Sequence, residues 1–354
     1  MVSQAEDIWK AYTSNLATLS DIVLNNDFDP DPMEQAEGLR YLTRLNRIAL
    51  EMFLENGDAA FPGLYQASHA TAKIGADNPD NYYQNATISG EHTYRISGYR
   101  GTVPILSFAT KANRYAINGT MASTGEIDIR DIICDDDGYF EIIVSRKKHS
   151  GNWLPMAEDS SMLIIRQTFF DKSREEPARV TLESISSKGS PTPLNLGALE
   201  SALEAVSAFV AGTAKTFLHW AGVFRREQFN RLATHDQSMF IRAGGDPMIY
   251  YLHGWWELAD DEYLTITSDI PNCEGWNFQL NNMWMESLDY RHHKIWMNNK
   301  SAHSNEDGTV TIQVGGPEHP NRLELASHRR GTMLWRWTGA KTHPMPHVKI
   351  LKSA

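Results

Sequence analysis

One histidine near the C-terminus lies in a setting suited to an iron-containing cofactor. His328 stands in the segment ASHRRG and is followed by two arginines. Imidazole can ligate a metal or act as a general acid or base near neutral pH, and guanidinium groups bind carboxylates. Haem needs both groups, because its iron takes an axial imidazole and its propionates take cations. We therefore predict His328 as the metal ligand and as a catalytic residue. The predicted cofactor-binding residues are Arg329, Arg330 and Arg336.

Two other functions are compatible with the same residues. A cofactor-free lyase or hydrolase would use His328 as its acid or base, together with Asp289 or Tyr290. A binding protein for hydrophobic small molecules would use tryptophans, and five of the ten in the chain lie between residues 255 and 296. An ordinary loop histidine also explains His328, so the sequence leaves these alternatives open.

A second histidine lies on a predicted long helix at residues 197–232. Apolar residues at helical spacing form one stripe of this helix, and His219 falls almost opposite it. The stripe consists of Leu199, Leu203, Val206, Val210, Ala214, Phe217, Ala221 and Phe224. The face that carries His219 is rich in small residues, next to which a flat ligand could pack. A solvated face is the simpler explanation, and His219 is our second choice of ligand or a distal catalytic partner.

The segment SLDYRHHKIWM, residues 287–297, reads as a strand with two adjacent histidines. Neighbouring side chains of a strand point to opposite faces, so at most one of His292 and His293 faces a pocket. We name Tyr290 and His292 as candidate catalytic residues and His293 as a further pocket candidate. The sequence assigns no individual role to any of the three.

Composition narrows the class of protein. The 354 residues carry a net charge of -11, which argues against a phosphate-binding surface for nucleic acid. No apolar run is long enough to span a bilayer, and the two cysteines have no CxxC spacing. The chain also lacks GxGxxG, GxxxxGK[ST], HExxH and GxSxG. We expect a cytoplasmic, soluble protein without nucleic-acid or membrane partners, and the oligomeric state stays open.

The order of predicted elements indicates an α+β protein with two β-rich lobes. Residues 1–75 form an N-terminal helical segment, in which Asp31, Pro32 and Glu34 make a capping-box start. Residues 76–185 form a first β-rich repeat, and residues 186–235 form a linker and the long connecting helix. Residues 236–354 form a second β-rich repeat that carries the candidate site.

An internal repeat relates the two β-rich parts. DGYFEIIV at 137–144 matches DGTVTIQV at 307–314, and each copy then reaches an Asn-x-Leu and a Met-Leu followed by arginine. From Asn152 to Met162 the first copy advances ten positions, and from Asn321 to Met333 the second advances twelve. We expect that the longer second connection, which contains Ser327–Gly331, places His328 in a cleft between the lobes.

Two segments, GNWLPMAEDSSMLIIRQTF and DNYYQNATISGEHTYRISGYRG, resemble the bacterial family filed as domain of unknown function 1214. The stretch Trp276 to His292 and the turn Ser327 to Gly331 are similar to longer members, and the resemblance covers most of residues 75–340. One departure is visible: where relatives commonly read Asn-Trp-Leu-Asp before the histidine turn, this chain has Asn321-Arg322-Leu323-Glu324.

The size and single-chain layout are also similar to haem-dependent oxygenases of the trans-anethole oxygenase type. Such enzymes cleave the propenyl C=C bond of phenylpropenes, as in anethole or isoeugenol, to aromatic aldehydes. The resemblance implies an oxidoreductase with haem iron, a small aromatic alkene as substrate, and dioxygen or peroxide as oxidant.

Overall fold

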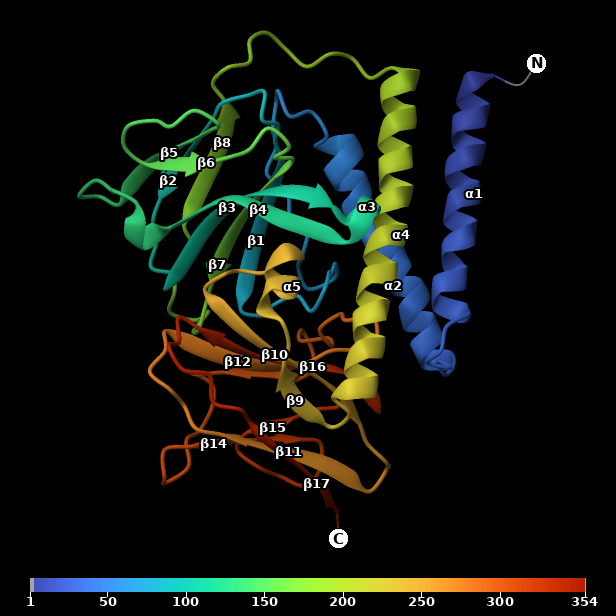
Figure 1. Cartoon of the computed structure of the whole chain (residues 1–354), viewed down its shortest axis with the longest axis vertical. Coiled ribbons are helices and arrows are strands. Elements are labelled where there is room, and N and C mark those ends of the chain that lie inside the picture. The colour runs from blue at the N-terminus through green and yellow to red at the C-terminus, as the bar shows by residue number, and fades with distance from the viewer. Residues whose placement is uncertain (1–2, 354) are drawn as a thin grey trace. The chain divides into compact units, whose positions relative to one another are not determined.

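The computed structural model describes residues 3–353, which divide into two compact units. The first lobe comprises the chain up to Ala72 and Asp80–Lys215, and the second comprises Lys73–Pro79 and the chain from Thr216. The chain therefore enters the second lobe briefly at residues 73–79 before it completes the first. The second crossing falls inside the long helix α4 (Leu196–Glu227; yellow-green in Figure 1).

The N-terminal helices begin where side chains cap them. In α1 (Gln4–Leu24) Ser3 and Glu6 form a capping box, and in α2 (Pro32–Leu50) Asp31 and Glu34 do the same. The predicted start at Asp31 is thus confirmed. A π-helical turn, η1 (Glu51–Glu55), extends α2. No helix within residues 3–353 is both long and apolar enough to cross a bilayer.

The first lobe contains two four-stranded sheets. One has the order β1 (Asn81–Thr87), β7 (Met162–Thr168), β3 (Ile105–Arg114) and β4 (Thr120–Asp128). The other has the order β6 (Trp153–Pro155), β5 (Tyr139–Ser145), β2 (Tyr94–Tyr99) and β8 (Arg179–Ser184). Two short helices, α3 (Tyr115–Asn118) and η2 (Ile129–Asp131), flank β4.

The second lobe repeats this arrangement strand for strand. One sheet has the order β10 (Ile249–Glu257), β16 (Arg330–Thr338), β12 (Gly275–Leu280) and β13 (Trp296–Asn298). The other has the order β15 (Arg322–Leu323), β14 (Val310–Val314), β11 (Glu262–Ser268) and β17 (His347–Lys352). Before them lie β9 (Arg231–Thr234) and α5 (Gln237–Arg242). Each lobe pairs its strands antiparallel except for one parallel pair, β5 with β6 and β14 with β15.

These matching sheet orders confirm the α+β fold with two related β-rich lobes. The predicted helix at 197–232 is also present, but it ends at Glu227, and residues 231–234 form β9 instead. The apolar stripe of α4 is buried from Leu203 to Phe224, as its spacing predicts.

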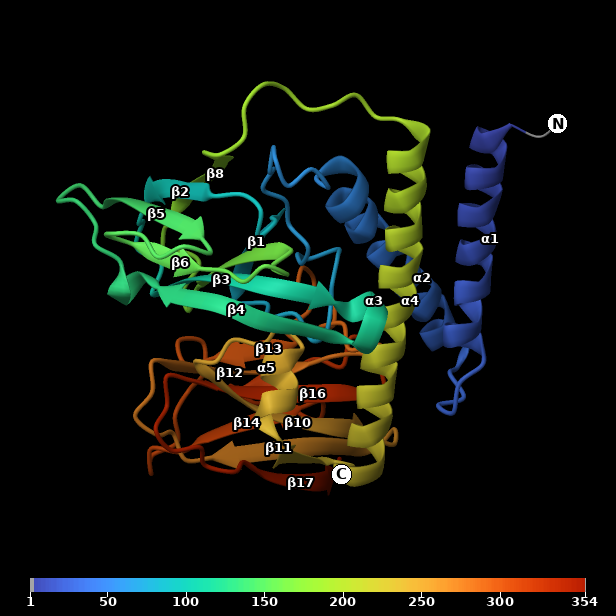
Figure 2. The same cartoon turned by 45° about the horizontal axis from the view of Figure 1, so that its top comes forward.

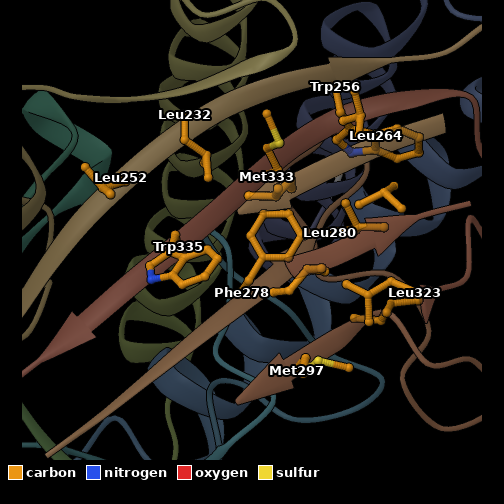
Figure 3. Packing of buried hydrophobic residues seen from close by; sticks show 14 of the residues in the cluster. Leu232, Leu252, Trp256, Leu264, Phe278, Leu280, Met297, Leu323, Met333 and Trp335 are labelled. Atoms are coloured by element: carbon orange, nitrogen blue, oxygen red, sulfur yellow. The ribbon is translucent and has the colours of Figure 1, made fainter. Parts of the chain in front are cut away.

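Figure 2 shows the two sheets of each lobe. Buried apolar side chains form one core in each lobe. In the second lobe this core contains four tryptophans, of which Trp276 and Trp335 stack with ring centroids 4.9 Å apart. Trp335 also packs beside Phe278, as Figure 3 shows. Trp256 and Trp337 complete the set. Trp256 and Trp276 belong to the 255–296 tryptophans that a binding pocket would use, but with Trp335 and Trp337 they fill the interior of the lobe.

The Asn-x-Leu motif has the same structural task in both lobes. The side-chain amides of Asn152 and Asn321 each donate to two backbone carbonyls, and their Oδ1 atoms each accept one backbone N–H. The carbonyls belong to Ile133 and Glu141 in the first lobe and to His303 and Thr311 in the second. Because both bond sets match, the two motifs occupy equivalent positions.

The two arginines of β7 and β16 also occupy equivalent positions. Arg166 and Arg336 each lie opposite the second tyrosine of a Tyr-Tyr pair on the neighbouring strand. Three residues earlier, Leu163 and Met333 both lie in the core of their lobe. Leu163, and not Met162, therefore corresponds to Met333, so the predicted match of the two Met-Leu pairs is wrong by one position. A shift of one residue along a strand turns every side chain to the other face. Leu163 lies 11 positions after Asn152, and Met333 lies 12 positions after Asn321. The second connection is therefore longer by one residue, not by two.

We predict that Trp335→Ala lowers the free energy of unfolding by about 3–5 kcal/mol, because it leaves a cavity between the sheets. Urea denaturation followed by circular dichroism measures the change. Trp9→Ala is the matched control, since Trp9 is 61% exposed and its loss should change stability little. A variant as stable as the parent would mean that the core around Trp335 is not tightly packed.

Candidate functional site

The second lobe carries an open pocket with a volume of about 320 Å³. Three ionisable side chains line it: His293, Arg322 and Glu324. The remaining wall comes from Gly315–Gly316 at the end of β14 and from Leu325–Ser327 after β15. The lengthened connection of the second repeat therefore forms one wall of a pocket.

A histidine and a carboxylate are paired in this pocket. His293 Nδ1 lies 2.9 Å from Glu324 Oε2, and the backbone N–H of Lys294 donates to Oε1 of the same carboxylate. The bond from His293, followed by the one from Lys294, lowers the pKa of Glu324. With Glu324 ionised, Nδ1 is the donor, and Nε2 is left as the nitrogen that can take up a proton.

The pair contributes orientation more than stability. The side chains of His293 and Glu324 are 41% and 43% exposed. Ion pairs at such exposure contribute about 0–1 kcal/mol, because solvent screens them. A carboxylate that fixes one ring nitrogen of an accessible histidine is the arrangement that prepares imidazole for acid–base work.

Glycines and a left-handed turn form the pocket wall. Gly315 and Gly316 have φ values of 71° and 69°, and a Cβ on Gly316 would collide with the Tyr263 ring. Ala326 and Ser327 also have positive φ, 47° and 67°, which is uncommon for residues with a side chain. The residue added to the second connection is thus accommodated by two successive left-handed residues.

His328 stabilises this turn from the inside. The residue is only 6% exposed, its Nδ1 lies 2.8 Å from the backbone oxygen of Ala326, and its backbone N–H donates to Leu325 O. His328 does not belong to the pocket lining, although the residues just before it do. Its buried ring, anchored through Nδ1 to a carbonyl, has the orientation that ligating histidines often show.

The predicted cofactor-binding arginines differ in their surroundings. Arg336 is 4% exposed, and its guanidinium donates to Gln279 Oε1, to Asn277 Oδ1 and to the backbone oxygen of Ala76. Arg329 is half exposed and pairs with Asp260 at 2.7 Å. Arg330 begins β16 at the edge of the turn.

As a set, these residues do not fit a haem. His328 suits an axial ligand, but Arg336 is engaged by three protein oxygens and Arg329 by a carboxylate, so neither is available to a propionate. Within residues 3–353 no group of three or more His, Cys, Asp and Glu side chains could hold a metal ion either. The haem prediction therefore depends on His328.

The other predicted catalytic residues are dispersed. His219 is exposed on α4, and His292 is exposed in a turn. Tyr290 is partly buried, and Lys73 Nζ lies 4.7 Å from the centre of its ring. None of the three lines the pocket with His293.

The predicted strand through residues 287–297 is wrong over most of its length. Only Trp296–Asn298 forms a strand, while residues 290–293 form turns. The cause is Asp289, whose side chain accepts the backbone N–H of Arg291 and whose carbonyl accepts that of His293. The turn exposes His292 and brings His293 to Glu324.

One histidine that sequence reasoning missed is fully buried. His253 of β10 stacks on Phe224 and packs against the tilted ring of Phe240, with ring centroids 4.7 and 4.6 Å away. Burial, with Arg336 and His235 nearby, holds the pKa of His253 well below its usual value, so the ring is neutral. Within the described chain its Nδ1 has no hydrogen-bond partner. Its place in the aromatic-rich segment IYYLHGWWE, which forms β10, is the sequence signal that could have found it.

Comparison with known proteins places the chain in a family. Residues 80–168 match the family model described as "Protein of unknown function (DUF1214)". The crystal structure of an uncharacterized protein from Burkholderia cenocepacia is similar at 44% identity and a TM-score of 0.96, covering 98% of this chain and 97% of that chain. The chain belongs to the family of this Burkholderia protein and contains a DUF1214 domain.

The DUF1214 match runs from the start of β1 to the end of β7, within the first lobe, so the pocket lies outside it. The VPA0106 protein from Vibrio parahaemolyticus shares the fold alone, with 11% identity and a TM-score of 0.50 over 96% of this chain and 100% of that chain. A comparison with proteins of curated function found no match. The resemblance to DUF1214 is thus confirmed, and the likeness to alkene-cleaving oxygenases stays a prediction.

We predict that His293→Ala returns the pKa of Glu324 toward its ordinary value, because its strongest hydrogen bond is lost. Since the folded pKa is depressed, the bond is present at higher pH and is lost as the pH falls through that value. Carboxyl ¹³C chemical shifts followed against pH measure the change. His347→Ala, at an exposed histidine of β17, should leave the titration of Glu324 unaltered. An unchanged pKa in His293→Ala would mean that the two side chains are not paired in solution.

Proposed function

We propose that the chain is a cofactor-free lyase or hydrolase whose general base is His293. The observation that carries the proposal is the 2.9 Å contact between His293 and Glu324 in the lining of the pocket. The sequence assigned the acid–base role of such an enzyme to His328. The pocket favours His293, because it lines the cavity and its Nδ1 is held by a carboxylate rather than by a backbone carbonyl.

The chemistry needs only these two side chains and a bound substrate. Glu324 accepts the Nδ1–H of His293, and Nε2 removes a proton from the substrate or from a water molecule. The imidazolium that forms is stabilised by the adjacent carboxylate. It then returns the proton to the leaving group, so that His293 ends the cycle neutral. General acid–base catalysis of this kind contributes roughly 10²–10⁴-fold to a rate.

We predict that protein treated with EDTA turns over at least one of two probes, 5-nitrobenzisoxazole, which tests proton abstraction, or p-nitrophenyl acetate, which tests hydrolysis. His293→Ala should lower kcat/KM by about 10²-fold or more, because the base is removed. Glu324→Gln should act mainly on kcat and shift the pH profile, because Glu324 positions the base without reacting. The control His347→Ala should retain full activity. Lack of turnover above buffer, or an active His293→Ala variant, would refute the proposal.

A second candidate is a haem-dependent oxygenase of the trans-anethole oxygenase type, with a phenylpropene as substrate. Its support is His328, a buried imidazole anchored through Nδ1 to the Ala326 carbonyl. The predicted arginines add no support, because Arg336 and Arg329 are engaged by protein oxygens.

We predict for this candidate that protein expressed with a haem precursor shows a Soret band, and that His328→Ala abolishes it. His219→Ala, at an exposed helix position, should retain the band. Visible absorption spectra of the three purified proteins give the answer. A colourless parent protein that haemin does not reconstitute would eliminate the haem candidate and leave the acid–base enzyme.

A further inference from the structure

We propose that Arg322 binds a carboxylate of the substrate, so that the pocket accepts small organic acids. The inference rests on the proposed function, because it takes the same pocket as the substrate site. It adds the chemical class of the substrate and a residue that determines specificity.

The first lobe has a neutral residue at the position equivalent to Arg322. Because the Asn-x-Leu motifs are equivalent, Arg322 corresponds to Trp153. The indole Nε1 of Trp153 donates to the backbone oxygen of Ser145 at the end of β5. Arg322 Nε likewise donates to the backbone oxygen of Gly316, just after β14, at 3.0 Å. The equivalent of Ser145 is Gly315, so Arg322 bonds a carbonyl one position further along, and a guanidinium takes the place of the indole.

Strand geometry directs the two distinctive residues of this segment to one face. Arg322 and Glu324 are two positions apart, and Leu323 between them is fully buried in the core. Both flanking side chains therefore point away from the core, and both line the pocket. Their equivalents in the first lobe are Trp153 and Pro155, so both polar groups belong to the second lobe alone.

Arg322 is suited to an external anion. Within residues 3–353 it forms no ion pair at salt-bridge distance, and its single side-chain hydrogen bond uses Nε. The two Nη groups remain as a fork that matches a carboxylate. Arg322 also lowers the pKa of Glu324 slightly, but His293 and Lys294 already satisfy that carboxylate. An acid bound to Arg322 would lie in the same pocket as the base His293.

The volume limits the size of the acid. About 320 Å³ is at the lower end for ligand pockets, which favours a substrate of one small ring or a short chain. Benzoate and its uncharged isostere benzamide are therefore suitable probes. Inorganic phosphate tests whether the site prefers a different small anion.

The test is a titration of the isotope-labelled full chain, followed through the backbone amides of Gly315 and Ser327. We expect benzoate to shift both resonances and benzamide to leave them unchanged. Arg322→Trp, which installs the residue of the first lobe, should weaken benzoate binding by about tenfold or more. Arg322→Lys should have an intermediate effect, because it keeps the charge and loses the fork. Arg242→Trp, at an arginine of α5, is the control and should bind benzoate normally.

Three outcomes would overturn the assignment: equal binding of benzamide, unchanged benzoate affinity in both Arg322 variants, or tighter binding of phosphate than of benzoate. A separate variant distinguishes this failure from that of the proposed function. His293→Ala should bind benzoate within about threefold of the parent, since the anion contact is retained, while it loses turnover. Turnover that survives in His293→Ala refutes the proposed base and leaves the carboxylate site standing.

Discussion

The second lobe depends on satisfying the buried guanidinium of Arg336. It is satisfied by two side-chain amides of β12 and by the carbonyl of Ala76, in the segment 73–79 that crosses from the first lobe. Because a buried charge without partners costs several kcal/mol, β16 can occupy only the register that meets these acceptors. That register turns Trp335 and Trp337 into the core and fixes where the preceding turn must end. The same turn forms a wall of the pocket.

The two lobes share a scaffold, and they differ at the connection that lines the pocket. Both lobes keep the two sheets, the parallel strand pair and the asparagine that bonds the same backbone groups. The second lobe differs by one added residue before β16 and by Arg322 and Glu324 in place of tryptophan and proline. A connection at the surface tolerates such changes because few core contacts depend on it. The added residue is accommodated by left-handed backbone at Ala326 and Ser327.

The histidines illustrate why residue type alone does not identify a site. His328 is buried and tied to a carbonyl, His253 is buried and neutral between aromatic rings, and His293 is accessible and paired with a carboxylate. All three have the same chemistry in the unfolded chain. Burial and the nature of the Nδ1 partner separate them, and both depend on residues distant in sequence. Glu324, for example, lies 31 positions from His293.

The local elements and their repetition can be read from the chain. The capping box at Asp31, the apolar stripe of α4 and the paired Asn-x-Leu motifs follow from short-range bonds and periodicity, which a linear pattern records. The remaining features depend on contacts between distant segments. The two Met-Leu pairs match in sequence, but their side chains point to opposite faces of the sheet. Only strand pairing shows which side chain enters the core. The strand expected at 287–297 became a turn at Asp289, and that turn brought His293 to Glu324. A pocket depends on contacts between separate segments, and no spacing along the chain encodes them.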